Sequence, residues 1–87
     1  MYWVYVLQHD TSHELYIGKT DDIKRRVREH NRGAQTSTRR KNGIWKIVYA
    51  ELYRSRRDAD VREVKLKQHG SNKRWLVNRI KHSLLED

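Results

Sequence analysis

Two short apolar runs near the start of the sequence have the two-residue period of β-strands. The first, Tyr2 to Leu7, is aromatic and β-branched and apolar on both sides, which is typical of a strand covered on both faces. The second, Leu15 to Gly18, follows after a polar turn. We predict that the two runs pair as a β-hairpin. This pairing would bring Tyr5 beside Tyr16, a contact that most often serves only packing between strands.

The pattern then changes to that of an amphipathic helix. The stretch from Asp22 to Arg32 begins with acids and ends with basic residues, and Gly33 follows it as a C-cap. Thr20 or Asp21 would cap its start. The positions expected to face the sheet are Ile23, Val27 and His30. Arg26 shares a face with His30 and lies at the edge of this apolar stripe, where an arginine often only covers the core with its alkyl stem.

Three further elements complete the predicted fold. Ile44 to Tyr53 is a third strand, in which Trp45, Ile47 and Tyr49 should share one face. A capping box that begins at Ser55 opens a second helix, which ends at His69-Gly70, and a third helix runs from Lys73 to about Leu85. We therefore predict one domain over residues 1–87, of the mixed α/β (α+β) class, with a three-stranded antiparallel sheet flanked by helices.

Glu63 is the most informative acidic residue in the sequence. It shares a stripe of the second helix with Ala59 and Leu66, and a carboxylate on a core-facing stripe is costly unless it meets a cation, a metal ion or hydrogen-bond donors. An ion pair with an arginine would satisfy it as well as a metal would.

The net charge of the chain indicates what kind of partner it binds. Twenty Lys and Arg against eleven Asp and Glu give a net charge of +9 and a pI near 10.2, which favours a polyanion. Arg39, Arg40 and Lys41 lie among hydroxyl side chains in a polar loop suited to phosphate contacts. No apolar run is long enough to span a membrane and there is no cysteine, so we expect a soluble cytoplasmic protein that binds nucleic acid rather than a membrane.

Taken in order along nearly the whole chain, these stretches resemble the GIY-YIG endonuclease family, in particular its small single-domain members. Val4-Tyr5-Val6 stands in place of the first motif and keeps its tyrosine, and Tyr16-Ile17-Gly18 is the second motif intact. Arg26 matches the arginine of the family's first helix. Glu63 matches its metal-binding glutamate, and Asn78 stands where small members often carry asparagine.

The resemblance implies a site on one sheet face and hydrolysis of DNA phosphodiester bonds with one divalent ion, Mg²⁺ or Mn²⁺, as in DNA repair, recombination or the processing of structured DNA. Glu63 would hold the ion. Tyr5 would act as general base for an attacking water, which requires that nearby positive charge lower its pKa. Lys19 or His30 would supply that charge or relay the proton.

The remaining matched residues would support the same reaction. Tyr16 would position Tyr5 or the phosphate, and Arg26 would neutralise charge that develops on the phosphoryl oxygens. Asn78 would be a supporting substrate contact. A chain this short leaves no room for a separate recognition domain, so target choice would come from a targeting protein, from oligomerisation or from DNA shape.

Two other readings remain open from the sequence. The chain could be a binding module on the same fold that holds DNA or structured RNA without cutting it, although the joint presence of Tyr5, Tyr16, Arg26 and Glu63 argues for an enzyme. It could also be a small basic RNA binder associated with ribosomes, for which the charge alone would suffice. Metal-dependent nicking separates the enzyme from both.

Overall fold

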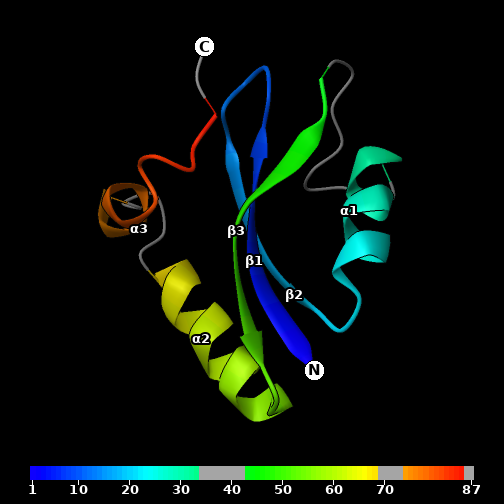
Figure 1. Cartoon of the computed structure of the whole chain (residues 1–87), viewed down its shortest axis with the longest axis vertical. Helices are drawn as coiled ribbons and strands as arrows, with labels where there is room; N and C mark the ends of the chain where they lie inside the picture. Colours follow the sequence, from blue (N-terminus) through cyan, green and yellow to red (C-terminus); the bar gives the residue numbers. More distant parts are fainter. Residues whose placement is uncertain (34–42, 69–73, 86–87) are drawn as a thin grey trace.

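The computed structural model describes residues 1–33, 43–68 and 74–85. Along the chain its elements are β1 (Tyr2–His9), β2 (Leu15–Thr20), α1 (Ile23–Asn31), β3 (Trp45–Tyr53), α2 (Arg56–Gln68) and α3 (Arg74–Arg79). The strands form one antiparallel sheet in the order β2-β1-β3, with β1 in the centre (Figure 1). The predicted α+β class and three-stranded antiparallel sheet are confirmed.

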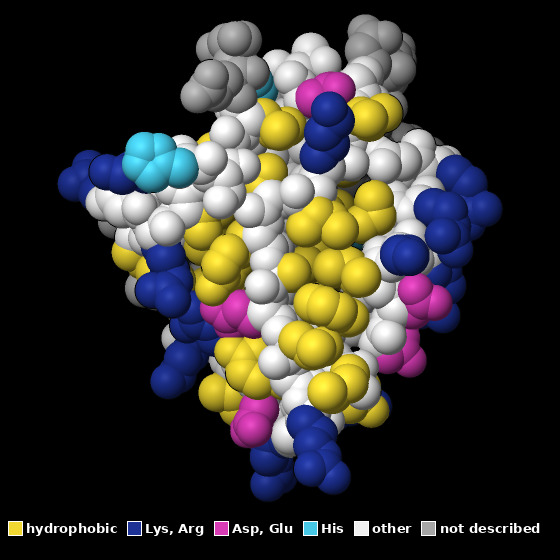
Figure 2. Space-filling view, in the orientation of Figure 1, with side chains coloured by type: hydrophobic (Ala, Val, Ile, Leu, Met, Phe, Trp, Pro, Cys, Tyr) yellow, Lys and Arg dark blue, Asp and Glu magenta, His cyan; other side chains and the backbone are white. Residues whose placement is uncertain are grey.

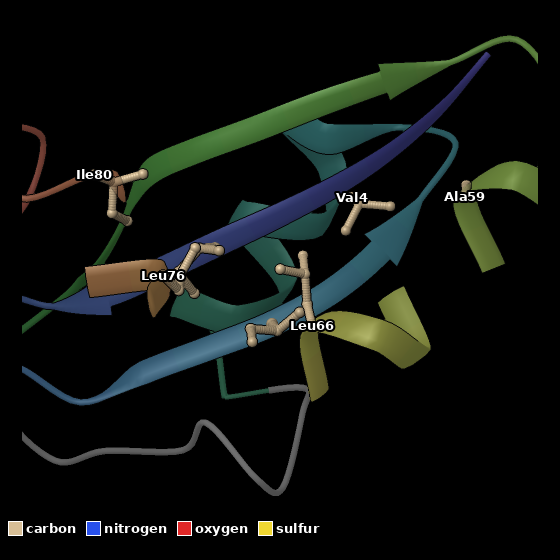
Figure 3. Close-up of a cluster of buried hydrophobic side chains, with 7 residues drawn as sticks. Val4, Ala59, Leu66, Leu76 and Ile80 are labelled. Carbon is tan, nitrogen blue, oxygen red and sulfur yellow. The ribbon is translucent and has the colours of Figure 1, made fainter. Parts of the chain in front are cut away.

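The sheet lies between two helical layers. Helix α1 covers one face, while α2 and α3 lie on the other (Figure 1). Alternate residues of β1 point into the two layers, which explains why this strand is apolar on both sides. The buried residues on the α2–α3 side are Val4, Val6, Ile17, Ala59, Leu66, Leu76 and Ile80 (Figure 3). Those on the α1 side are Tyr5, Leu7 and Trp45, with Ile23 and Val27 packed against them.

Helix α1 is fixed at both of its ends. Asp22, rather than the predicted Thr20 or Asp21, is the N-cap, and its carboxylate accepts the Arg25 backbone N–H at 3.1 Å. Thr20 instead stabilises the turn before the helix, where its hydroxyl accepts the Asp22 N–H at 3.1 Å. At the other end the Asn31 side chain bonds both backbone groups of Trp45, at 2.7 and 3.1 Å. These contacts set the position of α1 over the sheet.

Strand β3 does not keep the strict alternation that we predicted. Its register with β1 shifts where Val6 pairs with Tyr49 and Leu7 with Ile47, which leaves Val48 as an extra residue. Val48 and Tyr49 consequently both pack on the α2–α3 side. The predicted grouping of Trp45, Ile47 and Tyr49 on one face is therefore wrong for Tyr49.

Helix α3 is shorter than predicted, since it ends at Arg79 rather than near Leu85. Tertiary contacts override helix propensity here. The Ser83 N–H returns to the Ile80 carbonyl at 2.7 Å, and the Leu85 N–H donates to the Gln8 side chain of β1 at 2.7 Å. The predicted start at Lys73 lies outside the described residues. Within the described ranges, none of the helices combines the length and apolarity that crossing a bilayer would need.

Candidate active site

Three aromatic side chains from β1, β2 and α1 meet on one face of the sheet. Tyr5 and His30 are fully buried, and the Tyr5 hydroxyl lies 2.9 Å from His30 Nε2. Tyr16 is half-buried, with its ring centroid 6.3 Å from that of Tyr5 and 4.6 Å from that of His30. The two tyrosine rings lie near each other as predicted, although Tyr5 is opposite Gly18 and Tyr16 opposite Leu7 in the register, and His30 completes the cluster.

Gly18 makes room for the Tyr5 side chain. The two residues are opposite each other in the β1–β2 register. A Cβ at Gly18 would lie 2.4 Å from the Tyr5 hydroxyl oxygen and 2.6 Å from Tyr5 Cζ. The Tyr5 ring therefore extends across the backbone of the edge strand β2, which only a glycine at this position permits.

Arg26 brings positive charge to the Tyr5 hydroxyl. Its guanidinium bonds Glu29 at 3.2 Å and lies beside the Tyr5 oxygen, where it acts to lower the pKa of Tyr5. Burial outweighs this effect and raises that pKa to about 12. The expectation of a lowered Tyr5 pKa is therefore wrong. Among the described residues, the buried Arg26 Nε has no hydrogen-bond partner.

His30 is uncharged at neutral pH. Burial and the neighbouring Arg26 charge lower the pKa of His30 to about 4. Since Arg26 has only donors, the Tyr5 hydroxyl that it faces is best assigned as the donor to His30 Nε2. We had expected His30 either to supply positive charge or to relay the proton. Because it is neutral, it cannot supply the charge, but it can accept the Tyr5 proton.

Lys19 faces the other layer of the molecule. It pairs with Val4 in the register, so its side chain points towards α2, where the ammonium group contacts the Asp60 carboxylate. The positive charge that acts on Tyr5 comes from Arg26 instead.

Glu63 lies on α2 with only 19% of its side chain exposed, and its carboxylate is 3.2 Å from Lys67 Nζ. The ion pair is thus with a lysine rather than an arginine. The Glu63 charge acts to raise the pKa of Tyr5, so the two side chains are electrostatically coupled although they approach from opposite layers.

The described residues contain no group of three or more His, Asp or Glu side chains placed to share a metal ion. A single, mostly buried carboxylate fits an ion such as Mg²⁺, which binds through one or two carboxylates and takes its other ligands from water and substrate phosphates. Glu63 is compatible with such an ion.

The other predicted site residues are not brought to this cluster. Asn78 is exposed on α3, whose buried residues pack on the opposite face of the sheet. Arg39, Arg40 and Lys41 lie outside the described residues.

Sequence reasoning missed a second polar cluster, on the α2 side of β3. The Glu51 carboxylate accepts the Tyr49 and Tyr53 hydroxyls at 2.5 and 2.6 Å. It also accepts two bonds from Arg62, at 2.8 and 3.1 Å, and the Arg62 guanidinium lies 5.4 Å from the centroid of the Trp75 ring. The alternation of Tyr49, Glu51 and Tyr53 along one strand face could have revealed it. Through the pair of Glu51 and Arg62, this cluster joins β3 to α2 at the residue that precedes Glu63.

Comparison with known proteins gives a consistent result. The family model described as the GIY-YIG catalytic domain matches residues 1–76. The UPF0213 protein CPE1444 of Clostridium perfringens is 35% identical over 75 residues, which cover 85% of this chain and 78% of the relative. The UPF0213 protein HQ_3675A of Haloquadratum walsbyi is 33% identical over 73 residues, covering 84% and 81%.

A solved structure is similar as well. The solution NMR structure of the UPF0213 protein BH0048 from Bacillus halodurans matches with a TM-score of 0.56 and 26% identity, covering 93% of this chain and 86% of that one. The UPF0213 names state no activity. Since the family match spans most of the sequence and the relatives are about one-third identical to it over the aligned residues, the chain belongs to the GIY-YIG family of nucleases.

Proposed function

We propose that this protein is a divalent-metal-dependent endonuclease that hydrolyses phosphodiester bonds in DNA. One observation carries the proposal beyond family membership. The buried Tyr5 hydroxyl contacts a neutral His30, with the Arg26 guanidinium beside it and the Glu63 charge acting on the same phenol. Such a combination of a proton acceptor, a cation and a carboxylate is suited to hydrolysis of a phosphodiester.

Tyr5 would act as general base through His30. A phenol with a pKa of about 12 is a strong base once ionised, but it keeps its proton at neutral pH. His30 Nε2 would take the Tyr5 proton as the Tyr5 oxygen takes one from the attacking water. Because His30 begins neutral, it has the capacity for this proton. Arg26 would neutralise the charge that develops on the phosphoryl oxygens.

Glu63 would hold one Mg²⁺ or Mn²⁺ ion, which when bound supplies a Lewis acid for the leaving oxygen. The Lys67 ammonium neutralises Glu63. Binding a divalent ion would therefore displace the side chain of Lys67.

Other residues would hold the DNA. Tyr16 is half-buried within the cluster and would contact the phosphate or keep Tyr5 in place. Lys19, Asn78 and the loop residues Arg39, Arg40 and Lys41 are our candidates for substrate contacts. A targeting protein or DNA shape would select the target.

The test is incubation of the purified protein with linear, supercoiled, branched and single-stranded DNA, each with Mg²⁺, with Mn²⁺ or with a chelator. We expect cleavage of at least one DNA, dependent on the ion and abolished by the chelator. An Arg26→Ala variant should lose cleavage and also bind DNA more weakly, because a phosphate contact is gone.

The control is an Arg28→Ala variant, which removes the same charge from an exposed position of α1. It should keep cleavage measurable. Tight, salt-sensitive DNA binding with no cleavage under any condition would instead favour the binding module. Co-sedimentation with ribosomes, again without cleavage, would favour the RNA binder.

A further inference from the structure

A cavity of about 330 Å³ opens beside the candidate active site, at the end of the sheet where β1 begins and β2 ends. The starts of α1 and α2 lie at this same end, the lower one in Figure 1. Its lining, which we call the basic cavity, includes four cations, one aromatic residue and one acid: Lys19, Arg25, Arg26, Arg56, Tyr2 and Asp21.

The cations of the basic cavity outnumber the acids available to them. Lys19 contacts Asp60, and Arg25 contacts both Asp21 and Glu29. Within residues 1–33, 43–68 and 74–85, Arg56 makes no hydrogen bond or ion pair with another side chain, and its charge only acts at longer range on the Asp60 carboxylate that Lys19 contacts. Two helix N-termini add partial positive charge at the same place. Cations gathered around one hollow repel one another, and a bound anion would relieve that repulsion.

Arg26 connects the basic cavity to the candidate active site. It lines the cavity and also lies beside the Tyr5 hydroxyl. A polyanion whose reacting phosphate lay at Tyr5 would therefore place a neighbouring phosphate next to the cavity. Tyr2 provides an aromatic surface against which a base or sugar could pack. The volume lies at the small end of the range of about 300–1,000 Å³ for ligand sites, and so suits a single nucleotide rather than a duplex.

We propose that the basic cavity binds the phosphate of the nucleotide adjacent to the one that is cleaved, with Arg56 as its main cation. This subsite rests on the proposed function, because it supposes that a nucleic-acid strand reaches Tyr5. It also goes beyond that function by identifying Tyr2, Arg25 and Arg56 as substrate contacts.

Arg56 and Arg57 provide a matched pair for the test. They are consecutive, exposed residues in the first turn of α2, and only Arg56 lines the cavity. Binding of a fluorescent single-stranded oligonucleotide would be measured by anisotropy in chelator, over a range of salt concentrations, for the wild type, Arg56→Ala, Arg57→Ala and Arg56→Lys. Thermal unfolding of each variant would confirm that it is folded.

We expect Arg56→Ala to weaken binding about tenfold, the loss typical of a hydrogen bond from a charged group. Its slope of log affinity against log salt should fall by about 0.7, the contribution of one phosphate contact on a single strand. Arg57→Ala should change the affinity less than about twofold, since an exposed charge away from the strand is screened by salt. Arg56→Lys should recover most of the loss. Equal losses for Arg56→Ala and Arg57→Ala would overturn the subsite.

Inorganic phosphate separates a strand phosphate from a free anion. At matched ionic strength, phosphate should displace the oligonucleotide no better than chloride does. Displacement by phosphate that disappears in Arg56→Ala would overturn the proposal in favour of a site for free phosphate. A wild-type protein that cuts no DNA but shows the selective Arg56 effect would refute the proposed function and reduce the subsite to a contact with a strand phosphate that has no cleaved neighbour.

Discussion

At the scale of single residues, Tyr5 and His30 form a hydrogen-bonded pair in which both side chains are uncharged at neutral pH. The apolar stripe of α1 indicated that His30 faces the sheet, and the resemblance to the GIY-YIG family placed it in one site with Tyr5. The sequence could not predict their ionisation, because the pKa of Tyr5 depends on how far burial exceeds the effect of one arginine. The same burial, together with Arg26, keeps His30 neutral. Two predictions follow from this pair and its surroundings.

The first concerns stability in acid. The pKa of His30 is about 4 in the folded protein and 6.5 when unfolded, so below pH 6.5 the unfolded chain takes up the proton first. Stability should be full above pH 6.5 and should fall as the pH approaches 4, by about 2 kcal/mol between pH 7 and 4.5. Urea unfolding at several pH values measures it. Glu51 titrates below this window, because its pKa falls from 4.5 to about 2 on folding.

The matched variant is His30→Gln, which retains a hydrogen-bonding side chain without a titrating ring. Its stability should change little over the same range. A wild type and a variant with the same pH dependence would show that His30 is not the group responsible.

The second prediction concerns Gly18. A Gly18→Ala change would place a Cβ against the Tyr5 ring, so the ring must move, at a cost of about 1–3 kcal/mol. Denaturant unfolding should show this loss, and any cleavage activity should fall with it. In Tyr5→Leu, which lacks the ring, adding Gly18→Ala should cost much less. Strictly additive effects of the two changes would contradict the close packing of Tyr5 over Gly18.

At the scale of elements, the order, type and approximate limits of the strands and helices followed from hydrophobic period and capping residues. The exceptions depend on contacts between elements far apart in sequence. The extra residue Val48 reflects pairing with β1, and the early end of α3 reflects the bond between Leu85 and Gln8. The sequence also did not show which layer each helix joins, and that arrangement separates Asn78 from Tyr5.

The Glu51–Arg62 pair links β3 to α2 and sets the orientation of the helix that carries Glu63. Burial alone would raise the pKa of Glu51, but bonds from Arg62, Tyr49 and Tyr53 outweigh burial and lower it to about 2. Arg62→Met should therefore leave a mostly buried, less compensated carboxylate and cost about 3 kcal/mol at pH 7.

The control is Asp21→Asn, which breaks an exposed ion pair with Arg25. It should cost less than about 1 kcal/mol. The excess cost of Arg62→Met should shrink as the pH falls from 4.5 towards 2 and Glu51 takes up a proton. Equal destabilisation by the two changes in urea unfolding would argue against a structural role for the buried cluster.

At the scale of the whole molecule, most of the described Lys and Arg side chains lie exposed around the layers. Figure 2 shows hydrophobic side chains along the middle of one face, with Lys and Arg on both sides and at the lower tip. The net charge of +9 was evident from the sequence alone, whereas the convergence of four cations on one cavity required the fold.

DNA affinity should accordingly be largely electrostatic and weakly selective for sequence. We expect the logarithm of affinity to fall linearly with the logarithm of salt concentration, by about 0.9 for each phosphate contact on duplex DNA. Titrations of two unrelated duplexes at several salt concentrations measure both properties. Affinity that does not depend on salt would contradict this prediction.

Glu63→Gln tests the proposed catalytic role most directly, through nicking rate, DNA affinity and thermal stability measured on the same preparations. The change keeps shape and hydrogen bonding but removes the charge proposed to hold the ion. We predict a folded protein that binds DNA as well as the wild type or slightly better, with divalent-dependent nicking abolished. Lys67→Ala, which removes only the ion-pair partner of Glu63, should still nick. A folded Glu63→Gln protein that nicks DNA at the wild-type rate would contradict the catalytic account.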